Sequence, residues 1–478
     1  MVSTKNVSKS DEILSVASTR GFFFPTAGIY GGRAGFYTYG HLGKLLKSNW
    51  EFLWRKHFLS KDNFWEVQSN NILPEPVFKA SGHLENFSEC RVKCSKCNSE
   101  FRIDDIVLDD SKCLKCNNKL VLSKDDGFNM MFPLVVGSGE KAYLSPETAQ
   151  GAYITFKDEF KATRGKLPLG LAILDKAYRN ELSPRNLFFR LREFSQAELQ
   201  IFFNPDLPGF PDDVEWKGIK DYGLLLAQAD NNHKVSKVSC SDAFKKFKLP
   251  KFYLSGLVRV QKFFLDIIGV PSDKFRLFEV PEGDRAFYNR IHYDVEILLD
   301  SLGGFKEVAG VHYRGDHDLS RHQSLSKEKL EVFHDGKRFI PHVLELSFGV
   351  DRNVWLLFDI FYHKDLKKSD TLLFRFPKLL APFQVSVLPL VNKEGLDVKA
   401  LEIHNSFRNA GISSFFDDSG SIGKRYARND EAGTPFCVTV DGQTLDDESV
   451  TIRVRDTSEQ SRVKIGELII TLQRLLSS

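Results

Sequence analysis

The sequence predicts an α+β protein in which an antiparallel sheet with flanking helices is followed by a compact α/β domain. Up to about Pro205 the chain mixes glycine-rich aromatic turns with strand-like runs such as Glu66–Leu73. Alternation of this kind is typical of half-buried strands. From about Ala381 the pattern changes to strand, helix and strand, which is typical of a smaller α/β unit. We expect domains at residues 1–375 and 376–478.

Composition limits the classes of protein to consider. The 66 basic and 63 acidic residues leave a net charge of only +3, so nucleic acid would have to bind at local basic patches. The first 14 residues, MVSTKNVSKSDEIL, lack the apolar region of a secretory signal. No run of about 18 apolar residues is present to span a membrane. We therefore expect a cytoplasmic protein that does not enter a membrane.

The first long helix is expected from about Leu42 to Phe58. Its apolar residues recur close to a spacing of i, i+3, i+4 and i+7. They are Leu42, Leu45, Leu46, Trp50, Leu53, Trp54 and Phe58. The pattern alone favours a core helix and a helix at an interface equally.

Four of the seven cysteines form two CxxC pairs, Cys94 with Cys97 and Cys113 with Cys116. Each CxxC turn presents two thiolates to one ion, and two such turns complete a tetrahedral zinc site. Four protein ligands leave no position for water, which favours a structural role. The alternatives are a site that has lost its metal and a reactive thiol pair. We expect a zinc module at about residues 88–122, and we expect the other cysteines, Cys90, Cys240 and Cys437, to be small buried residues.

The segment Tyr178–Glu198 carries an arginine and a carboxylate, then a loop, then more arginines. Two strands joined by this loop would direct Arg179, Glu181, Arg190 and Arg192 at one anionic ligand, and a triphosphate is the natural candidate. Neither GxxxxGK[ST] nor a GxGxxG strand-to-helix turn is present. ATP would therefore be bound by side chains.

The segment from Asp206 to about Glu279 is lysine-rich and is predicted to be mainly helical. Its lysines either contact RNA phosphates or form a solvated surface.

The last hundred residues predict strands near 383–391, 412–416, 435–441 and 449–456, with a helix through Leu401 and Ile403 between the first two. Asp441 and Gly442 are expected to form the turn between the last two strands. A capping box at Thr457–Gln460 is expected to start the final helix. The apolar face of this helix consists of Ile465, Leu468, Ile469, Leu472 and Leu475.

The R-x-E pair, the loop and R-x-x-x-F (Arg190–Phe194) resemble motif 2 of the class II aminoacyl-tRNA synthetases. Further blocks, in order along the chain, resemble the glycyl-tRNA synthetases of the dimeric type. The six blocks are Arg20–Gly43, Lys79–His83, Pro146–Gly151, Arg179–Arg185, Leu344–Arg352 and Asp417–Asp441. The resemblance implies an antiparallel class II catalytic domain with residues 206–279 as an insertion. It also implies a C-terminal anticodon-binding domain and makes 42–58 the helix that forms a homodimer.

The same resemblance implies a glycine-tRNA ligase that activates glycine with ATP and Mg²⁺ and transfers it to the 3′ end of tRNA(Gly). Arg179 would contact the α-phosphate and Arg352 the γ-phosphate, which makes these two arginines the catalytic pair. Glu181 would bind the adenine amino group and Phe194 would stack on the ring. The complete implied ATP set is Arg179, Asn180, Glu181, Phe189, Arg190, Leu191, Arg192, Glu193, Phe194, Glu307, Val308, Gly349 and Arg352.

Glycine offers only a carboxylate, an ammonium and the absence of a side chain. Clustered carboxylates would bind the ammonium and fill the space of a methyl group, and no editing site is expected because every competitor is larger. For Mg²⁺, Glu307 is the first choice and Glu345 the second, and Asp318 is a further pocket candidate. The implied glycine set is Arg102, Glu147, Phe194, Ser195, Gln196, Ala197, Glu198, Arg314, Glu345, Leu346, Ser347, Phe348 and Gly349.

Three positions depart from the family pattern. Ser145 replaces an arginine, Leu346 a proline and Asp351 a glycine. Two alternatives stay open: a class II synthetase for another amino acid, and a non-catalytic relative that binds nucleic acid. Lys424, Arg425 and Arg428 are either anticodon contacts or residues that cap and solvate a helix.

Overall fold

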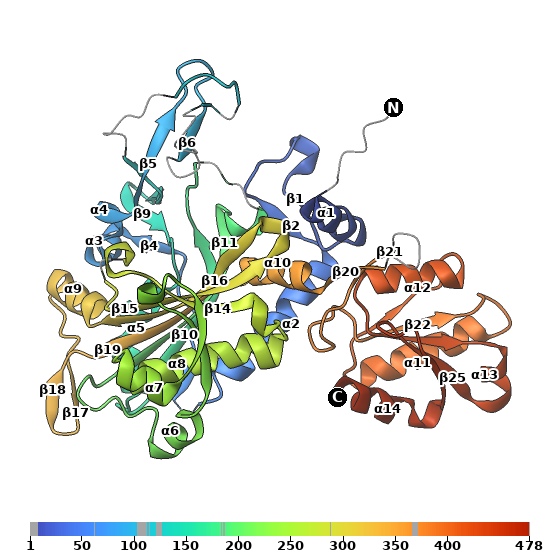
Figure 1. Cartoon of the computed structure of the whole chain (residues 1–478). Coiled ribbons are helices and arrows are strands. Elements are labelled where there is room, and N and C mark those ends of the chain that lie inside the picture. Colours follow the sequence, from blue (N-terminus) through green and yellow to red (C-terminus); the bar gives the residue numbers. More distant parts are fainter. Residues whose placement is uncertain are drawn as a thin grey trace.

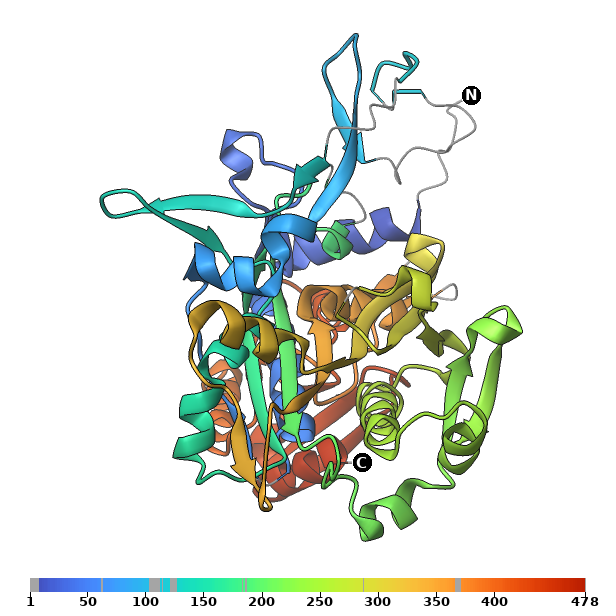
Figure 2. The same ribbon diagram turned by 90° about the vertical axis from the view of Figure 1, so that its left-hand side faces the viewer.

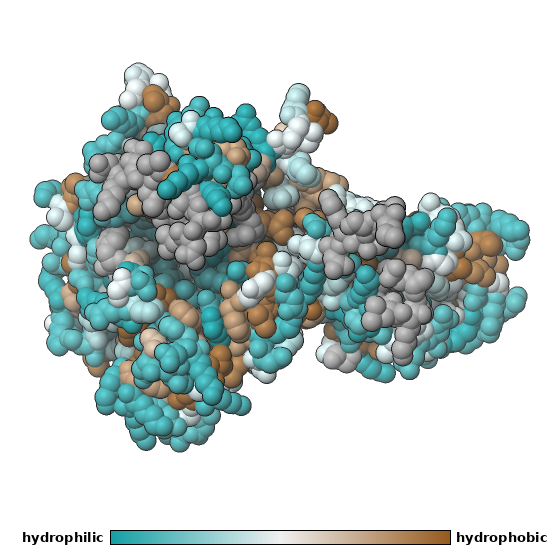
Figure 3. Space-filling view, turned by 45° about the horizontal axis from the view of Figure 1, so that its top comes forward, coloured by the Kyte–Doolittle hydropathy of each residue, from teal (hydrophilic) through white to brown (hydrophobic). Residues whose placement is uncertain are grey.

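The computed structural model describes residues 8–61, 63–102, 112, 113, 115–120, 127–182, 184, 187–286, 288–365 and 371–477. Figure 1 shows a large lobe, and beside it a smaller lobe made by the C-terminal residues. In the space-filling view, hydrophobic residues gather along the junction between the lobes, while much of the rest of this face is hydrophilic (Figure 3). An ion pair between Arg20 and Glu431 crosses this junction.

The large lobe is built on a sheet in which nine strands are found among the described residues. Neighbours are antiparallel except for β10 with β3 and β12 with β14, so the prediction of an antiparallel sheet is confirmed. In spatial order the strands are β13 (Val235–Ser239), β12 (Gly223–Ala227), β14 (Phe275–Glu279), β15 (Ile291–Leu299), β16 (Gly304–Gly315), β19 (His342–Gly349), β11 (Glu193–Phe203), β10 (Leu169–Tyr178) and β3 (Phe64–Glu66).

The predicted long helix is confirmed as α2 (His41–Phe58). Its apolar stripe is buried because Trp50 and Trp54 pack edge-on against Phe348 of β19. Gly43 lets the helix cross the chain closely, since a Cβ there would lie 1.8 Å from the Phe22 carbonyl oxygen. The other helices of this lobe outside the 206–279 segment are α1 (Lys9–Arg20), α3 (Glu75–Ser81), α4 (His83–Asn86), α5 (Ala149–Ala162), α9 (His317–Ser326) and α10 (Val350–Phe361).

Short strands form smaller sheets around the lobe. Figure 2 shows that the β8–β9 hairpin projects well away from it. The pairings are β1 (Phe23–Pro25) with β2 (Tyr37–Tyr39); β4 (Ile72–Pro74), β9 (Glu140–Leu144) and β8 (Phe132–Val136); β6 (Glu100–Arg102), β5 (Ser88–Lys93) and β7 (Gly127–Asn129); β17 (Val332–His334) with β18 (Lys337–Phe339); and β20 (Tyr362–Asp365) with β21 (Thr371–Phe374). The strand expected over Glu66–Leu73 is wrong at its centre, where residues 67–71 form a loop between β3 and β4.

The predicted helical character of residues 206–279 is only partly correct. Besides helices α6 (Asp213–Ile219), α7 (Cys240–Lys246) and α8 (Lys251–Lys262), the segment contains β12, β13 and β14, which extend the main sheet. Leu254, Leu257 and Val260 of α8 are buried in the same core as the strands of the large lobe. The segment is therefore integrated into the lobe and is not a separate helical appendage.

The C-terminal lobe has its own core. Its sheet combines parallel and antiparallel pairs, which suits the predicted α/β domain. The strand order is β23 (Ser414–Phe416), β22 (Val385–Pro389), β24 (Phe436–Val440), β25 (Ser449–Val454) and β26 (Gln460–Lys464). The helices are α11 (Leu396–Asn409), α12 (Ile422–Glu431), α13 (Gly442–Asp447) and α14 (Ile465–Ser477).

Two local predictions in this lobe are wrong. Asp441 does not form a hairpin turn, because its side chain caps α13 by accepting a hydrogen bond from the Thr444 amide. Thr457 does not start the final helix, because Gln460–Lys464 pair with β25 as an edge strand before α14 begins at Ile465. At Asp441 a helix cap replaces the expected turn, and at Thr457 strand pairing overrides the local capping signal.

The basic cluster after the Gly-Ser-Ile-Gly turn holds loops together. Arg425 is buried and donates to the carbonyl oxygens of Asp418 (2.6 Å) and Gly420 (2.9 Å). Arg428 pairs with Asp417 at 2.7 Å, and only Lys424 is exposed. Two of these three residues therefore have structural roles.

The expectation for the lone cysteines is correct for Cys240 and Cys437, which are buried, and wrong for Cys90, which is exposed on β5. Among the residues described, no helix is both long enough and apolar enough to cross a membrane.

Candidate active site

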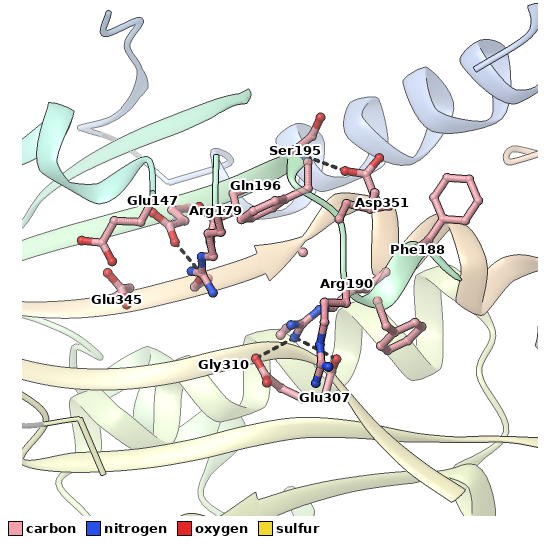
Figure 4. Close-up of a pocket in the computed structure, with 18 of the residues that line it drawn as sticks. Glu147, Arg179, Phe188, Arg190, Ser195, Gln196, Glu307, Gly310, Glu345 and Asp351 are labelled. Carbon is pink, nitrogen blue, oxygen red and sulfur yellow. Dashed lines mark hydrogen bonds and ion pairs between the residues drawn. The ribbon is translucent and has the colours of Figure 1, made fainter. Parts of the chain in front are cut away.

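The candidate site lies on one face of the main sheet, where alternate residues of three neighbouring strands face a common pocket. Register places them in rows across the strands. Glu198 lies opposite Ser347, which lies opposite Gly310; in the next row Gln200 lies opposite Glu345, which lies opposite His312. Figure 4 shows Glu147 and Glu345 at one end of the pocket, and Arg190, Phe188 and Glu307 at the other.

Arginines and aromatic rings form the second end of the pocket. The Arg179 guanidinium lies 5.2 Å from the centre of the Phe194 ring, and its Nε donates to the Pro146 carbonyl oxygen at 3.1 Å. Arg352 pairs with Glu307 at 3.0 Å and lies over Phe189. This end therefore offers planar cations beside flat apolar faces, which suits a nucleotide.

Two residues predicted for the ATP set point elsewhere. Arg192 donates from Nε to the Glu181 carbonyl oxygen (3.0 Å) and from Nη1 to that of Ala34 (3.1 Å). Glu193 pairs with Lys176 at 3.0 Å. Neither side chain lines the pocket; Arg192 instead fastens the loop that holds Ala34.

Three buried glutamates form the first end of the pocket. Glu198 accepts hydrogen bonds from Thr148 Oγ1 and Ser347 Oγ, both at 2.7 Å. Glu345 accepts from Gln200 Nε2 at 2.7 Å and from Arg314 Nη1 at 2.9 Å. These bonds fix the carboxylates before any ligand arrives.

Glu147 is fixed in the same way. It accepts from Gln150 Nε2 at 2.9 Å and lies 3.6 Å from His83 Nε2. A ligand would meet all three glutamates in prearranged positions.

Burial and mutual repulsion give the glutamates different affinities for a proton. Burial, together with the charges of Glu345 and Glu147, raises the pKa of Glu198 to about 8. Burial likewise raises the pKa of Glu345, against the opposing effect of Arg314. Although burial opposes it, the neighbouring His83 and Arg314 hold the pKa of Glu147 well below its usual range. The cluster thus holds excess negative charge that a cation would relieve.

Gln196 lies between the two ends of the pocket. Its side chain is 8% exposed, and within the described ranges its Oε1 has no hydrogen-bond partner. A buried acceptor left open in this way is costly unless a ligand or water completes it. Gln196 is therefore ready to accept a hydrogen bond from a bound molecule.

Several predicted site residues face away from the pocket. Ala197, Val308, Leu346 and Phe348 are buried in the core on the opposite face, as the period of two along a strand requires. Arg314 is buried beneath the glutamates and pairs with Asp318 at 2.9 Å. Asn180 does not line the pocket, and its amide donates to the Met130 carbonyl oxygen. Arg102 ends β6, and its side chain lies outside the described residues.

Motif reasoning missed several residues that line the pocket. They are Phe188, Tyr288, Ala309, Gly310, His312 and Asp351. Continuing the period of two from Arg314 back along β16 would have found His312 and Gly310. The others depend on loop geometry that no local pattern reveals.

The three residues that depart from the family pattern lie in different structural environments. Asp351 accepts from the Tyr39 hydroxyl at 2.6 Å and from the Ser195 amide. Leu346 packs in the core. Ser145 is buried, and in the part of the chain described its Oγ has no partner; nothing in the structure explains the serine.

The four cysteines of the two CxxC pairs come together away from this pocket. Their Sγ atoms all lie within 4.8 Å of one another, with Cys94 3.5 Å from Cys116 and Cys97 3.4 Å from Cys113. Both turns are alike: Asn98 and Asn117 have positive φ and donate to the carbonyl oxygens of Cys94 and Cys113. Zn–S bonds of about 2.3 Å in a tetrahedron place sulfurs roughly 3.8 Å apart, so the arrangement fits zinc.

Two family models match the chain. The tRNA synthetase class II core domain (G, H, P, S and T) matches residues 136–361, and the anticodon binding domain matches residues 384–475.

Similar proteins include archaeal enzymes over nearly the whole length. The chain is 34% identical to glycine-tRNA ligase from Pyrococcus furiosus, covering 98% of this chain and 99% of that protein. It is 33% identical to the protein of that name from Methanococcus maripaludis, covering 96% and 98%. Among solved structures, prolyl-tRNA synthetase from Cryptosporidium parvum superposes with a TM-score of 0.61 at 14% identity, covering 98% of this chain and 75% of that chain. That likeness shows the fold alone.

Proposed function

The chain belongs to the glycine-tRNA ligase family of class II synthetases, and on that premise we propose that it activates glycine with ATP and transfers it to the 3′ end of tRNA(Gly). The observation that carries the proposal is one pocket with three fixed, buried glutamates at one end and Arg179, Phe194 and Arg352 at the other. An ammonium and a triphosphate have opposite charges, and the pocket separates the groups that bind each.

In the first step, a glycine carboxylate oxygen attacks the α-phosphorus, and the bond to pyrophosphate breaks. The reaction mainly requires positioning and neutralisation of the developing charge. Arg179 would contact the α-phosphate. Arg352 and Arg190 would hold the outer phosphates, with adenine on Phe194.

In the second step, the terminal hydroxyl of the tRNA attacks the glycyl carbonyl carbon and loses its proton, and AMP leaves. The pocket must hold the adenylate until the tRNA arrives. Glu147, Glu198 and Glu345 would do so through the ammonium, which stays charged in both steps.

Glu307 is the better candidate for a Mg²⁺ ligand. Its side chain is 49% exposed at the phosphate end, and a bound magnesium ion would neutralise phosphate charge there while keeping most of its waters. Glu345 Oε2 already accepts from both Gln200 and Arg314, so that oxygen is less available to a metal ion. The cysteine cluster would hold a structural zinc ion, since all four thiolates are ligands.

We propose a homodimer that uses the outer side of α2 and the edge strand β3. Phe52 is 63% exposed on α2 and Trp65 is 53% exposed on β3. Arg55 and Glu66, at 2.6 Å, tie the two elements together. Large apolar side chains exposed at a sheet edge favour burial against a second copy.

The C-terminal lobe would bind the anticodon, as its family model implies. Charging of tRNA serves translation, so the proposal places the protein in the cytoplasm.

Aminoacylation of a tRNA(Gly) transcript with radiolabelled glycine, ATP and Mg²⁺ tests the proposal. We expect charging of tRNA(Gly), none of a tRNA(Ala) transcript, and strong loss with Glu198→Gln. Binding of tRNA without any charging or adenylate formation would favour a non-catalytic relative, and charging with another amino acid would favour a different class II specificity.

A further inference from the structure

His312 lines the pocket although no motif pointed to it. It stands on β16 directly opposite Glu345, and its Nε2 lies 3.7 Å from Glu345 Oε1. The glutamate is one of the three that form the glycine end of the pocket. His312 is therefore the neighbour of that end on the β16 side.

The imidazole leans over the bare backbone of Gly310. A Cβ built on Gly310 would lie only 2.4 Å from His312 Nε2. Gly310 shares a cross-strand row with Ser347 and Glu198. The ring thus occupies space in the same row as two residues of the glycine end.

Polar groups of neighbouring residues fix the orientation of the His312 imidazole. Asn289 Nδ2 donates to His312 Nδ1 at 3.1 Å, which leaves the proton on Nε2, facing Glu345. The His292 ring lies at a centroid distance of 4.2 Å, tilted by 40°, and pairs through Nε2 with Asp294 at 2.9 Å. Burial, with His292 and Arg314 nearby, lowers the pKa of His312 well below its usual value. The imidazole is therefore neutral and adds no second cation to compete with the ammonium.

We propose that His312, braced by Asn289 and His292, is a specificity-determining residue that sets the size limit of the amino acid pocket. The inference rests on the proposed glycine activation and deepens it. Carboxylates bind the ammonium group of glycine and that of alanine equally well. Discrimination between them therefore needs a rigid side chain that excludes one methyl group. In a well-formed pocket, one methyl group changes the preference between two substrates by about 10- to 200-fold.

The test compares the dissociation constants of glycyl- and alanyl-sulfamoyl adenosine, stable analogues of the two adenylates, by calorimetry. Binding of the analogues needs no catalysis, so their dissociation constants can still be measured for a variant with low activity. In His312→Ala we expect the preference for the glycyl analogue to fall at least about tenfold, mainly through tighter alanyl binding. The matched control is His334→Ala, in the β17–β18 hairpin outside the pocket, which should keep the wild-type ratio.

Asn289→Ala provides a second variant that keeps the imidazole but removes its hydrogen bond. A smaller loss of preference, about two- to fivefold, is expected because the ring gains freedom; this variant decides the question if His312→Ala does not fold. An unchanged ratio overturns the proposal. Equally weaker binding of both analogues also overturns the proposal, because His312 would then bind the substrate and would not limit its size. Failure of the wild-type protein to bind the glycyl analogue would instead count against the proposed function.

Discussion

At the scale of residues, the three glutamates at the proposed glycine end of the pocket differ in pKa. Glu147 is held ionised by His83 and Arg314, whereas Glu198 retains a proton more readily because it is buried beside Glu345 and Glu147. A bound ammonium supplies the missing positive charge. Substrate binding and ionisation of Glu198 are therefore linked.

The first prediction concerns that linkage. With a pKa of about 8, Glu198 is mostly protonated at pH 7, and an ammonium favours its ionised form. Glycine binding should therefore release a proton and tighten as pH rises from 6 to 8, with little further gain above 8. Calorimetry in two buffers of different ionisation enthalpy measures the proton. Glu198→Gln should bind glycine weakly and without this pH dependence; proton uptake by the wild type would contradict the assignment.

The second prediction separates two arginines that the sequence treats alike. Arg352 lines the pocket, whereas Arg192 is bound to backbone oxygens outside it. Arg352→Ala should lower kcat/KM for ATP in pyrophosphate exchange by about 10²-fold or more. Arg192→Ala should lower it by less than about tenfold and act mainly through stability of the loop at Ala34. Equal losses in both variants would mean that Arg192 turns into the pocket when ATP binds.

At the scale of elements, the zinc module and α2 carry separable predictions. The module is small, and its buried residues form a cluster of their own that includes Cys94 and Cys113. A bound metal ion stabilises a module whose hydrophobic core is too small to stabilise it alone.

The third prediction is one zinc ion per chain, measured by elemental analysis. Cys97→Ser or Cys113→Ser should remove most of it, because each breaks the four-thiolate set. Cys90→Ser is the matched control, since Cys90 lies on β5 of the same module but outside the cluster. A full zinc content in both ligand variants would place the metal elsewhere.

The fourth prediction concerns association. The wild type should have twice the chain mass of 54.5 kDa by light scattering. Phe52→Glu combined with Trp65→Glu should shift it towards the monomer, because charge would be buried at the interface. Phe333→Glu is the control, being equally exposed at 63% but in the β17–β18 hairpin. A double variant that remains fully dimeric would rule this surface out.

Elements with a strong period could be predicted from sequence, and elements set by pairing could not. The stripe of α2 predicted that helix to within one residue. Thr457 looked like a helix start, but β26 follows it because residues 460–464 complete the edge of a sheet. In the pocket, Glu198 and Glu345 could be foreseen because they lie in recognisable motifs. His312 could not, because its role depends on register with Glu345 and on the bare backbone of Gly310.

At the scale of the whole molecule, one sheet supports both ends of the pocket. Strands β11 and β19 carry Glu198 and Glu345, and Glu147 precedes α5; β16 carries Glu307 and His312, and the nucleotide side chains come from β11, from the loop before it and from α10. Residues far apart in sequence, such as Glu147 and Asp351, therefore meet in one cavity (Figure 4). The smaller lobe has its own core and its own family match, to an anticodon binding domain. This division suits an enzyme that must read a tRNA at two distant points.

The most direct test of the central claim is ATP-pyrophosphate exchange by the purified, zinc-replete protein, with each of the standard amino acids offered separately in the presence of Mg²⁺. The account predicts exchange with glycine alone, and its near loss in Glu198→Gln. Exchange with a larger amino acid would contradict the assignment of the glutamate pocket to glycine. Absence of exchange with every amino acid would contradict catalysis itself.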